Sequence, residues 1–170
     1  IDSIAHNGVR FTQGYVSGPY CSPTRAGLLT GRYQTRYGHE FNGQGPKFGL
    51  PLTERTIAYI LKGMGYATCC IGKWHLGFEP QFAPTKRGFD EFFGTLANTP
   101  FYEPKNFVDS RLSTEVRKVG DPKFYTTTAY GERAVDWLEK HRKGPWFLYL
   151  PFNAQHAPLQ APESYLQKFD

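Results

Sequence analysis

The chain has 170 residues and a formal net charge of +5, and 39% of its residues are hydrophobic and 16% aromatic. This composition excludes disordered and fibrous classes, and the length is sufficient for one domain with a hydrophobic core. No apolar run reaches the roughly 18–20 residues that cross a bilayer. The basic residues are scattered, so we expect an anionic substrate and no nucleic acid.

The N-terminal part predicts one helix and one strand. Residues 1–7 have the pattern of the tail of a helix, which Gly8 can cap. Residues 9–17 predict a short strand followed by a loop. Residues 33–51 are rich in glycine and aromatic residues, which is typical of irregular structure.

The stretch YCSPTRAGLLTGR predicts a short helix with a cysteine at its start. Ser22 is a favourable N-cap, Pro23 is a favourable first helical residue, and Gly31 can end the helix. We therefore expect Cys21 to lie just outside the helix N-terminus, where free N–H groups favour negative charge. Arg25 adds a positive charge one turn into the helix.

Helix and strand patterns alternate through the rest of the chain. The predicted elements are a helix capped by Thr53 and ending at Gly65, a strand over 66–72, a helix over about 127–143, and an apolar strand over 146–154. Residues 98–123 predict no regular structure. The alternation predicts a three-layer α/β fold with a mainly parallel sheet flanked by helices.

Polar side chains follow the ends of two predicted strands. Lys73 and His75 come directly after one strand, and His156 follows another. In sheets of this kind ligands bind at the carboxyl ends of the strands. We therefore expect these three side chains, with Cys21 and Arg25, to converge in one crevice.

The residues alone leave more than one chemistry open. Cys21 is either a reactive thiol beside a helix N-terminus or an ordinary loop cysteine. Lys73 with His75 either binds an anion and moves protons, or is a solvated lysine beside a loop-capping histidine. His156 is either a site residue or a histidine in a proline-rich turn. His39 fits either kind of role and is left outside the predicted chemistry.

The remaining cysteines and histidines favour structural roles. Cys69 and Cys70 are adjacent in a predicted strand, so they point to opposite faces and are expected to fill the core. No zinc-type cysteine spacing is present. His6 and His141 are expected to be ordinary helix residues.

Several segments together resemble one protein family. CSPTRAGLLTGR resembles the first signature of the formylglycine-dependent (type I, arylsulfatase-like) sulfatases, and GYATCCIGKWHLG resembles the second. RGFDEFFG and FLYLPFNAQHAPLQAP also resemble sulfatase segments and occur in the same order. The resemblance covers nearly the whole chain, and it implies an alkaline-phosphatase-like α/β fold.

The resemblance implies a sulfuric ester hydrolase and assigns roles by position. Cys21 would be oxidised by a maturation enzyme to formylglycine, an aldehyde whose hydrate attacks the sulfate sulfur, and Arg25 would hold the modified side chain. Lys73 would bind sulfate oxygens and stabilise developing charge, and His75 would assist sulfate elimination. His156 would contact the sulfate or protonate the leaving oxygen. Asn98 would be a further polar contact to the sulfate.

The chain also departs from the family pattern. The carboxylate and amide pairs that bind Ca²⁺ or Mg²⁺ in the family are not in the sequence, which leaves only position 21, as formylglycine, among the metal ligands. Residues 1–170 are therefore expected to be part of an N-terminal sulfatase catalytic domain that lacks its first strand and its C-terminal portion, and to be inactive alone.

The resemblance also implies a substrate class and a location. We expect an aryl sulfate or, more specifically, a sulfated sugar or glycan as the substrate. The alternatives are a phosphonate or phosphodiester hydrolase of the same superfamily, and an inactive fragment. The expected location is extracytoplasmic, meaning periplasmic, secreted or lysosomal, with a signal peptide that is not in this chain.

Overall fold

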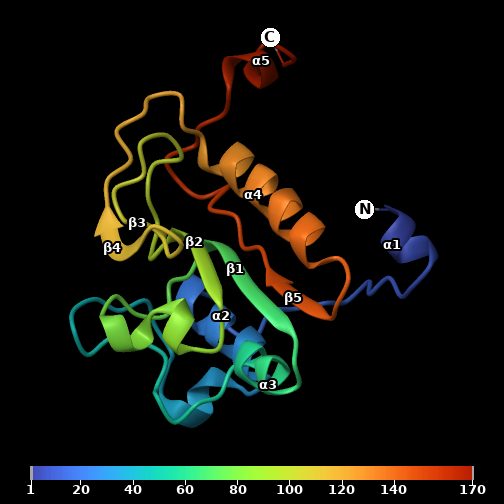
Figure 1. The fold of residues 1–170 in the computed structure, drawn as a ribbon, viewed down its shortest axis with the longest axis vertical. Coiled ribbons are helices and arrows are strands. Elements are labelled where there is room, and N and C mark those ends of the chain that lie inside the picture. The colour runs from blue at the N-terminus through green and yellow to red at the C-terminus, as the bar shows by residue number, and fades with distance from the viewer. Residues whose placement is uncertain (1, 170) are drawn as a thin grey trace.

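The computed structural model describes residues 2–169, and five strands within them form one sheet in the order β4-β3-β2-β1-β5 (Figure 1). The strands are β1 (Ala67–Lys73), β2 (Glu91–Thr95), β3 (Phe107–Asp109), β4 (Ser113–Arg117) and β5 (Trp146–Tyr149). β1 pairs in parallel with both β2 and β5, whereas β3 and β4 extend the sheet in antiparallel fashion. The expected α/β fold is confirmed, with a sheet that is mixed and has β1 in its parallel part.

Helices cover both faces of this sheet. The helices are α1 (Asp2–His6), α2 (Cys21–Thr30), α3 (Ile57–Gly63), α4 (Thr126–His141) and α5 (Glu163–Leu166), with short 3₁₀ turns at Gln34–Tyr37, Pro80–Phe82 and Pro84–Lys86. Cys70 packs in a core cluster with α2 and α3, and Cys69 packs in a second cluster with α4. The two cysteines therefore point to opposite faces and fill the core, as expected.

Several boundaries differ from the sequence prediction. Residues 9–17 contain no strand, and α3 is capped by Thr56, whose hydroxyl accepts from Tyr59 N–H, instead of by Thr53. The prediction of no regular structure over 98–123 is wrong, because β3 and β4 form there. β3 has three residues and every residue of β4 is exposed, so neither carries a recognisable alternation of buried and exposed side chains.

β5 is shorter and less buried than its apolar sequence predicted. It ends at Tyr149 instead of continuing to residue 154, and its residues are exposed or half-buried. Its only partner strand among residues 2–169 is β1, so β5 lies at the edge of the sheet. An apolar run indicates a strand but does not distinguish an edge strand from a central one.

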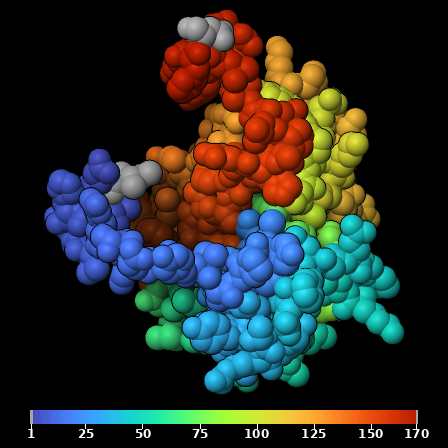
Figure 2. Space-filling view, turned by 180° about the vertical axis from the view of Figure 1, so that it is seen from behind, coloured from blue at the N-terminus to red at the C-terminus, as the bar shows by residue number. Residues whose placement is uncertain are grey.

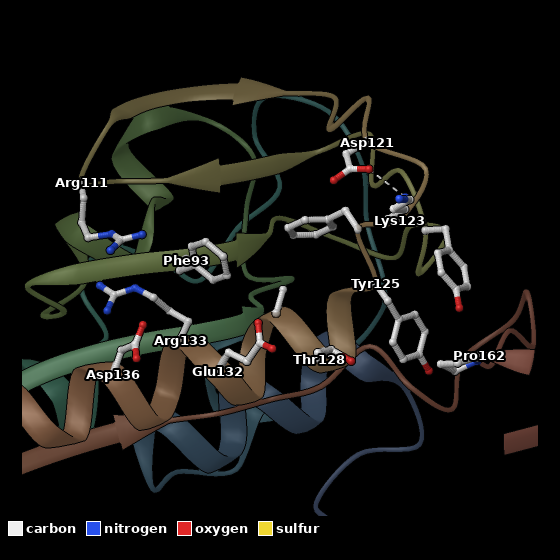
Figure 3. A pocket seen from close by; sticks show the side chains of 13 residues that line it. Phe93, Arg111, Asp121, Lys123, Tyr125, Thr128, Glu132, Arg133, Asp136 and Pro162 are labelled. Atoms are coloured by element: carbon white, nitrogen blue, oxygen red, sulfur yellow. Dashed lines mark hydrogen bonds between the residues drawn. The ribbon is translucent and has the colours of Figure 1, made fainter. Parts of the chain in front are cut away.

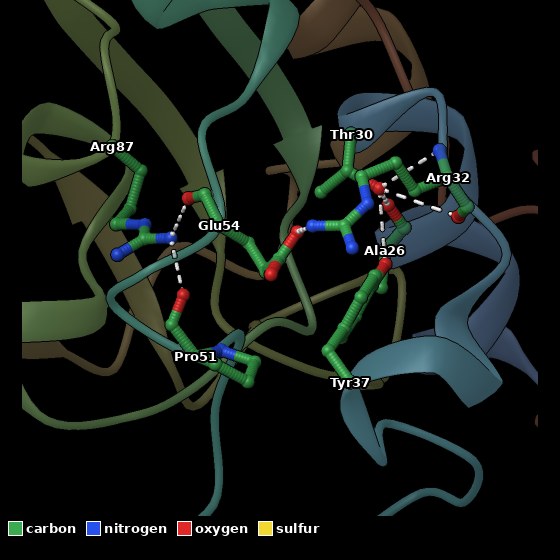
Figure 4. Close-up of polar contacts among 7 residues, drawn as sticks. All are labelled: Ala26, Thr30, Arg32, Tyr37, Pro51, Glu54 and Arg87. Carbon is green, nitrogen blue, oxygen red and sulfur yellow. Dashed lines mark hydrogen bonds and ion pairs between the residues drawn. The ribbon is translucent and has the colours of Figure 1, made fainter.

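The C-terminal end of α2 is tied to the segment that precedes α3. Gly31 ends α2 in the left-handed conformation, as predicted, with φ of 65°. Beyond it, Arg32 forms an ion pair with Glu54, and Thr30 contacts the Tyr37 hydroxyl at 3.0 Å (Figure 4). Arg87 donates hydrogen bonds to the carbonyl oxygens of residues 51 and 54. These contacts fix the position of the helix that begins with Cys21.

The N-terminal segment stands out from the rest of the molecule. Figure 2 shows its residues in blue, projecting along one side of the molecule. Phe11 and Tyr15 in this segment are more than 80% exposed. In the described part of the chain, no helix combines the length and apolar character needed to cross a membrane.

Candidate active site

The first turn of α2 is built differently from its prediction. The helix begins at Cys21, with Tyr20 as the N-cap, so Cys21 is the first helical residue instead of lying outside the helix. The Tyr20 side chain makes no capping hydrogen bond. Asn42 supplies a cap from a distant loop, because its Oδ1 accepts from the Ser22 N–H at 2.9 Å. The predicted cap, Ser22, is thereby free to use its hydroxyl elsewhere.

Gly72 allows β1 to deliver Lys73 to the end of the sheet. Its φ is 131°, and a Cβ at this position would lie 2.1 Å from the Pro151 carbonyl oxygen. Only glycine fits such a close approach. The next amide, Lys73 N–H, donates to the same Pro151 oxygen at 2.7 Å. The segment after β5 therefore packs directly against the end of β1.

The chain turns sharply after Lys73. Trp74 enters the core, and its indole N–H donates to the Phe82 carbonyl oxygen at 2.9 Å. His75 has a φ of 57°, in the left-handed region that non-glycine residues seldom adopt. The segment is thus not extended, as the spacing of Lys73 and His75 had suggested. Both side chains nevertheless reach the same site.

Two cations meet beside Cys21. Arg25 Nη1 donates to the Lys73 carbonyl oxygen at 2.7 Å and to the Tyr149 hydroxyl at 3.3 Å. Lys73 is 2% exposed, and its pKa is lowered by burial and by the Arg25 charge, while hydrogen bonding to Cys21 acts in the opposite direction. Among residues 2–169, no carboxylate forms an ion pair with either cation. The site therefore favours an anion.

Asn98 connects Lys73 to His156. Lys73 Nζ donates to Asn98 Oδ1, and Asn98 Nδ2 lies 2.9 Å from His156 Nε2. The other ring nitrogen, Nδ1, lies 2.8 Å from the Ala157 carbonyl oxygen, which can only accept. His156 Nδ1 therefore carries a hydrogen, and in the neutral ring Nε2 is an acceptor that Asn98 fills. The geometry aims Nε2 at the site.

His75 is a neutral, buried imidazole in this cluster. It is 6% exposed, and burial with the nearby Lys73 and Arg25 charges lowers its pKa to about 3. His156 and His39 act in the same direction, which places them close to the ring. Its Nδ1 has no hydrogen-bond partner in the described structure. The ring is therefore neutral at neutral pH, and a bound anion would raise its pKa and favour protonation.

The structure thus brings Cys21, Arg25, Lys73, His75, Asn98 and His156 together at the end of β1. It also shows a supporting residue that sequence reasoning missed. Asn153 is buried, its Oδ1 accepts from the Thr95 and Tyr130 hydroxyls, and its carbonyl oxygen accepts from the His156 N–H. A polar residue directly after an apolar strand, in PFNAQHAP, was the available signal.

The residues present do not fit a divalent cation. In the part of the chain that the structure describes, no group of three or more histidine, cysteine, aspartate or glutamate side chains could hold a metal ion. A calcium ion takes 6–8 oxygen ligands, several of them carboxylates. The charged neighbours of Cys21 are instead Arg25 and Lys73, which would repel a cation.

A second group of buried charges lies on the α4 side of the sheet, beside a cavity of about 660 Å³ (Figure 3). Arg133 pairs with Glu91, and Arg111 pairs with Asp109. Burial acts to raise the pKa of Asp109, but hydrogen bonds from Arg111 outweigh it and hold the pKa below its usual value. Each arginine here has a carboxylate partner, unlike the cations beside Cys21.

Comparisons with known proteins point to one family. The Sulfatase family profile matches residues 1–170. The chain is 36% identical to N-acetylgalactosamine-6-sulfatase of Sus scrofa, over 98% of this chain and 36% of that protein. It is also 36% identical to arylsulfatase J of Mus musculus, over 99% of this chain and 30% of that protein.

A solved structure shows the same fold. The structure of Ps i-CgsB in complex with k-i-k-neocarrahexaose is similar with a TM-score of 0.76 and 33% identity, over 91% of this chain and 39% of that chain. The chain therefore spans about a third of the length of the curated relatives that it matches.

Proposed function

The chain belongs to the sulfatase family, and from that premise we propose that it contributes the nucleophile side of a sulfuric ester hydrolase site. One observation carries this proposal. Arg25 and Lys73 lie beside Cys21 with no carboxylate partner among the described residues, so the site lacks only an anion to balance its charge. A sulfate group supplies that charge and several acceptor oxygens.

The proposed roles follow from the positions of the side chains. Lys73 binds a sulfate oxygen and offsets the charge that develops on the sulfate during transfer. Arg25 holds the side chain at position 21 and adds positive charge beside it. His75 assists sulfate elimination, because the charge of a bound sulfate would offset Lys73 and Arg25 and raise the pKa of the buried ring. His156 directs Nε2 at the site, where it contacts the sulfate or the leaving oxygen.

Position 21 suits the modification that the family implies. Cys21 is half-buried at the start of α2, so one side of it remains accessible. A formylglycine made there by a maturation enzyme would supply, as its hydrate, the attacking oxygen. A calcium or magnesium ion would need ligands from outside these 170 residues, and no step is assigned to it. We propose that residues 1–170 are part of an N-terminal sulfatase catalytic domain.

A sulfated sugar or glycan is the proposed substrate class. N-acetylgalactosamine-6-sulfatase, at 36% identity, acts on a sugar according to its name, and the similar Ps i-CgsB structure holds a neocarrahexaose. Relatives of this kind support an extracytoplasmic location for the protein.

Two measurements test the proposal. Mass analysis of the peptide that contains Cys21, after expression with a maturation enzyme, should show formylglycine in place of cysteine. The protein in its complete reading frame should then hydrolyse an aryl sulfate faster than the matched phosphate mono- and diesters. Preference for a phosphate ester would favour a phosphodiester or phosphonate hydrolase instead. An unmodified Cys21 with no turnover would favour an inactive fragment.

A further inference from the structure

Ser22 lies where three segments of the chain meet. Its hydroxyl oxygen is 2.6 Å from the His75 carbonyl oxygen and 2.6 Å from His39 Nε2. Its N–H donates to Asn42 Oδ1. Ser22 is fully buried and directly follows Cys21. The bonds of this one residue therefore join the turn that carries Cys21 to the turn that carries His75.

The direction of these hydrogen bonds assigns a donor role to His39. A hydroxyl has one hydrogen, and the His75 carbonyl oxygen can only accept. The Ser22 hydroxyl donates to that carbonyl, so its oxygen must accept from His39 Nε2–H. Burial lowers the pKa of His39 and favours the neutral ring, while a hydrogen bond to the Gly49 backbone acts in the opposite direction; a neutral imidazole is this donor when its hydrogen is on Nε2. The result is a chain of donors that runs from His39 through Ser22 to His75.

His75 needs such support because its backbone is strained. Its φ of 57° is sparsely populated by non-glycine residues and persists only where surrounding contacts hold it. The His75 N–H donates to the Leu96 carbonyl oxygen at 2.9 Å, and its carbonyl oxygen accepts from Ser22. Both hydrogen-bonding groups of its backbone are therefore fixed, and the second depends on Ser22.

A second contact connects His39 to His75 through a ring. The His39 imidazole stacks on Phe48 with 5.2 Å between ring centroids, and Phe48 meets the His75 ring at 6.5 Å with an angle of 67° between the rings. His39 is 5% exposed, so both of its contacts are held inside the protein. It thus reaches His75 by a hydrogen-bonded route and by an aromatic route.

We infer that His39 is a positioning residue that holds Ser22, and through Ser22 fixes the His75 turn relative to Cys21. The inference rests on the proposed function for its catalytic meaning, since His75 is a site residue only in that reaction. His39 makes no hydrogen bond to Cys21, Lys73 or His156 in the described structure, so its effect reaches the site through Ser22 and Phe48.

Three variants separate the two routes. His39→Gln keeps an N–H donor for Ser22 and loses the ring. His39→Phe keeps a buried ring that can stack on Phe48 and loses the donor. Ser22→Ala removes the hydroxyl that both His39 and His75 use. If the hydrogen-bonded route positions His75, His39→Phe and Ser22→Ala share one phenotype and His39→Gln stays close to the unchanged chain.

Amide hydrogen exchange in the 170-residue chain tests the positioning without requiring turnover. We expect the Ser22 and His75 amides to exchange about tenfold faster in His39→Phe and Ser22→Ala, the size expected from one lost hydrogen bond. His39→Gln should stay within about threefold, and the Cys70 amide inside β1 should not change in any variant. Unchanged Ser22 and His75 exchange in His39→Phe would overturn the inference.

Kinetics of the complete, modified protein test the consequence for catalysis. We expect His39→Phe to lower kcat about tenfold with KM unchanged, and His39→Gln to recover most of the loss. A wild-type protein without turnover but with the expected exchange pattern would contradict the proposed function and leave the positioning role standing. An active protein in which His39→Phe keeps its full kcat would overturn the positioning role.

Discussion

Two groups of cations on opposite faces of the sheet, each with one buried member, differ in what neutralises them. Beside α2, Arg25 and Lys73 have no carboxylate partner among residues 2–169. Beside α4, Arg133 pairs with Glu91, and Arg111 donates two hydrogen bonds to Asp109. Each group has one buried cation, Lys73 at 2% exposed and Arg133 at 5%, and these two differ in whether a carboxylate pairs with them.

This difference indicates that the charges beside α4 stabilise the fold, whereas those beside α2 are available to bind a ligand. Removing a charge from water is costly, and a buried ion pair with good hydrogen bonds offsets that cost within the fold. In the α4 group each arginine has a carboxylate partner, and two nitrogens of Arg133, Nε and Nη1, have no hydrogen-bond partner among the described residues. Lys73 has the Asn98 amide oxygen and the Cys21 side chain as partners, and neither is a carboxylate. The α2 group therefore gains most from an incoming anion.

The largest expected effect is at the nucleophile position. Cys21→Ala in the complete protein should reduce sulfatase turnover to the background rate, because alanine cannot be converted to formylglycine. The fold should be nearly unchanged, since Cys21 is half-buried and fills no core. Steady-state kinetics and thermal unfolding measure the two effects. Leu28→Ala, on the exposed side of α2, is the control. Substantial turnover in Cys21→Ala would contradict the formylglycine mechanism.

Sulfatase activity should fall when the charge of Lys73, which has no carboxylate partner, is removed. Lys73→Met keeps the side-chain volume and deletes the ammonium, and we expect kcat/KM for a sulfate ester to fall about 10²–10³-fold. Its melting temperature should be equal or higher, because a buried charge without a carboxylate partner is removed. Lys62→Met, which breaks a surface pair with Asp90, should change neither quantity much. A marked loss of stability with normal kinetics would reverse the assignment of the two groups.

Removing the charge of Arg133, which pairs with Glu91, should lower stability and leave activity unchanged. Arg133→Met leaves the partly buried Glu91 without its cation, and we expect a loss of about 1–3 kcal/mol in the free energy of unfolding. Turnover per folded molecule should be unchanged, since α4 contributes no side chain to the site. Denaturant unfolding measures the first quantity, and Lys140→Met on the exposed side of the same helix is the control. A loss of turnover without a loss of stability would contradict the comparison.

The sequence was informative wherever the signal was local. The periodic patterns of α2 and α4, the apolar β1 and the strand-end positions of Lys73 and His156 were predicted because each depends on neighbouring residues. β3 and β4 were not, because they are stabilised by pairing with distant strands and carry little pattern of their own.

The support around the site was harder to predict. Ser22 looked like a helix cap, and in the structure it binds residues 17, 20 and 53 positions away. No local pattern distinguishes a histidine such as His39, which donates to a remote hydroxyl, from one on the surface. The left-handed backbone of His75 also depends on contacts made after the chain has folded. The residue types alone indicated which chemistry the site could perform, whereas the arrangement of its side chains depends on contacts between distant segments.

His75 should also make the free energy of unfolding depend on pH. Its pKa is about 3 in the folded chain, below the ordinary value of about 6.5 that applies after unfolding. Between these values the unfolded chain binds a proton that the folded chain does not, so stability falls as the pH drops from 6.5 towards 3. Above pH 6.5 the group contributes no pH dependence.

We therefore expect His75→Asn to lose less stability than the unchanged chain between pH 7 and pH 4, by about 1–3 kcal/mol. Urea unfolding at both pH values measures the difference, and taking the difference between chains cancels the other titrating groups. His6→Asn in the exposed helix α1 is the matched control and should behave like the unchanged chain. Parallel stability curves for His75→Asn and the unchanged chain would show that His75 is not buried as a neutral ring.

The smallest expected effect is the absence of calcium binding. This measurement tests whether the site beside α2, with Arg25 and Lys73 unpaired, has too few carboxylate ligands for a cation. Calcium needs 6–8 oxygen ligands, and the described residues hold no cluster of three or more candidate ligands. We expect calorimetry of the 170-residue chain to show no saturable calcium binding in the micromolar range, and an aryl sulfate assay to show no turnover with or without the ion. The positive charge of Arg25 and Lys73 alone should bind sulfate weakly and lose it as salt rises. Micromolar calcium binding, or turnover that depends on calcium, would mean that a carboxylate set approaches these cations, and the distinction between the two groups would no longer hold.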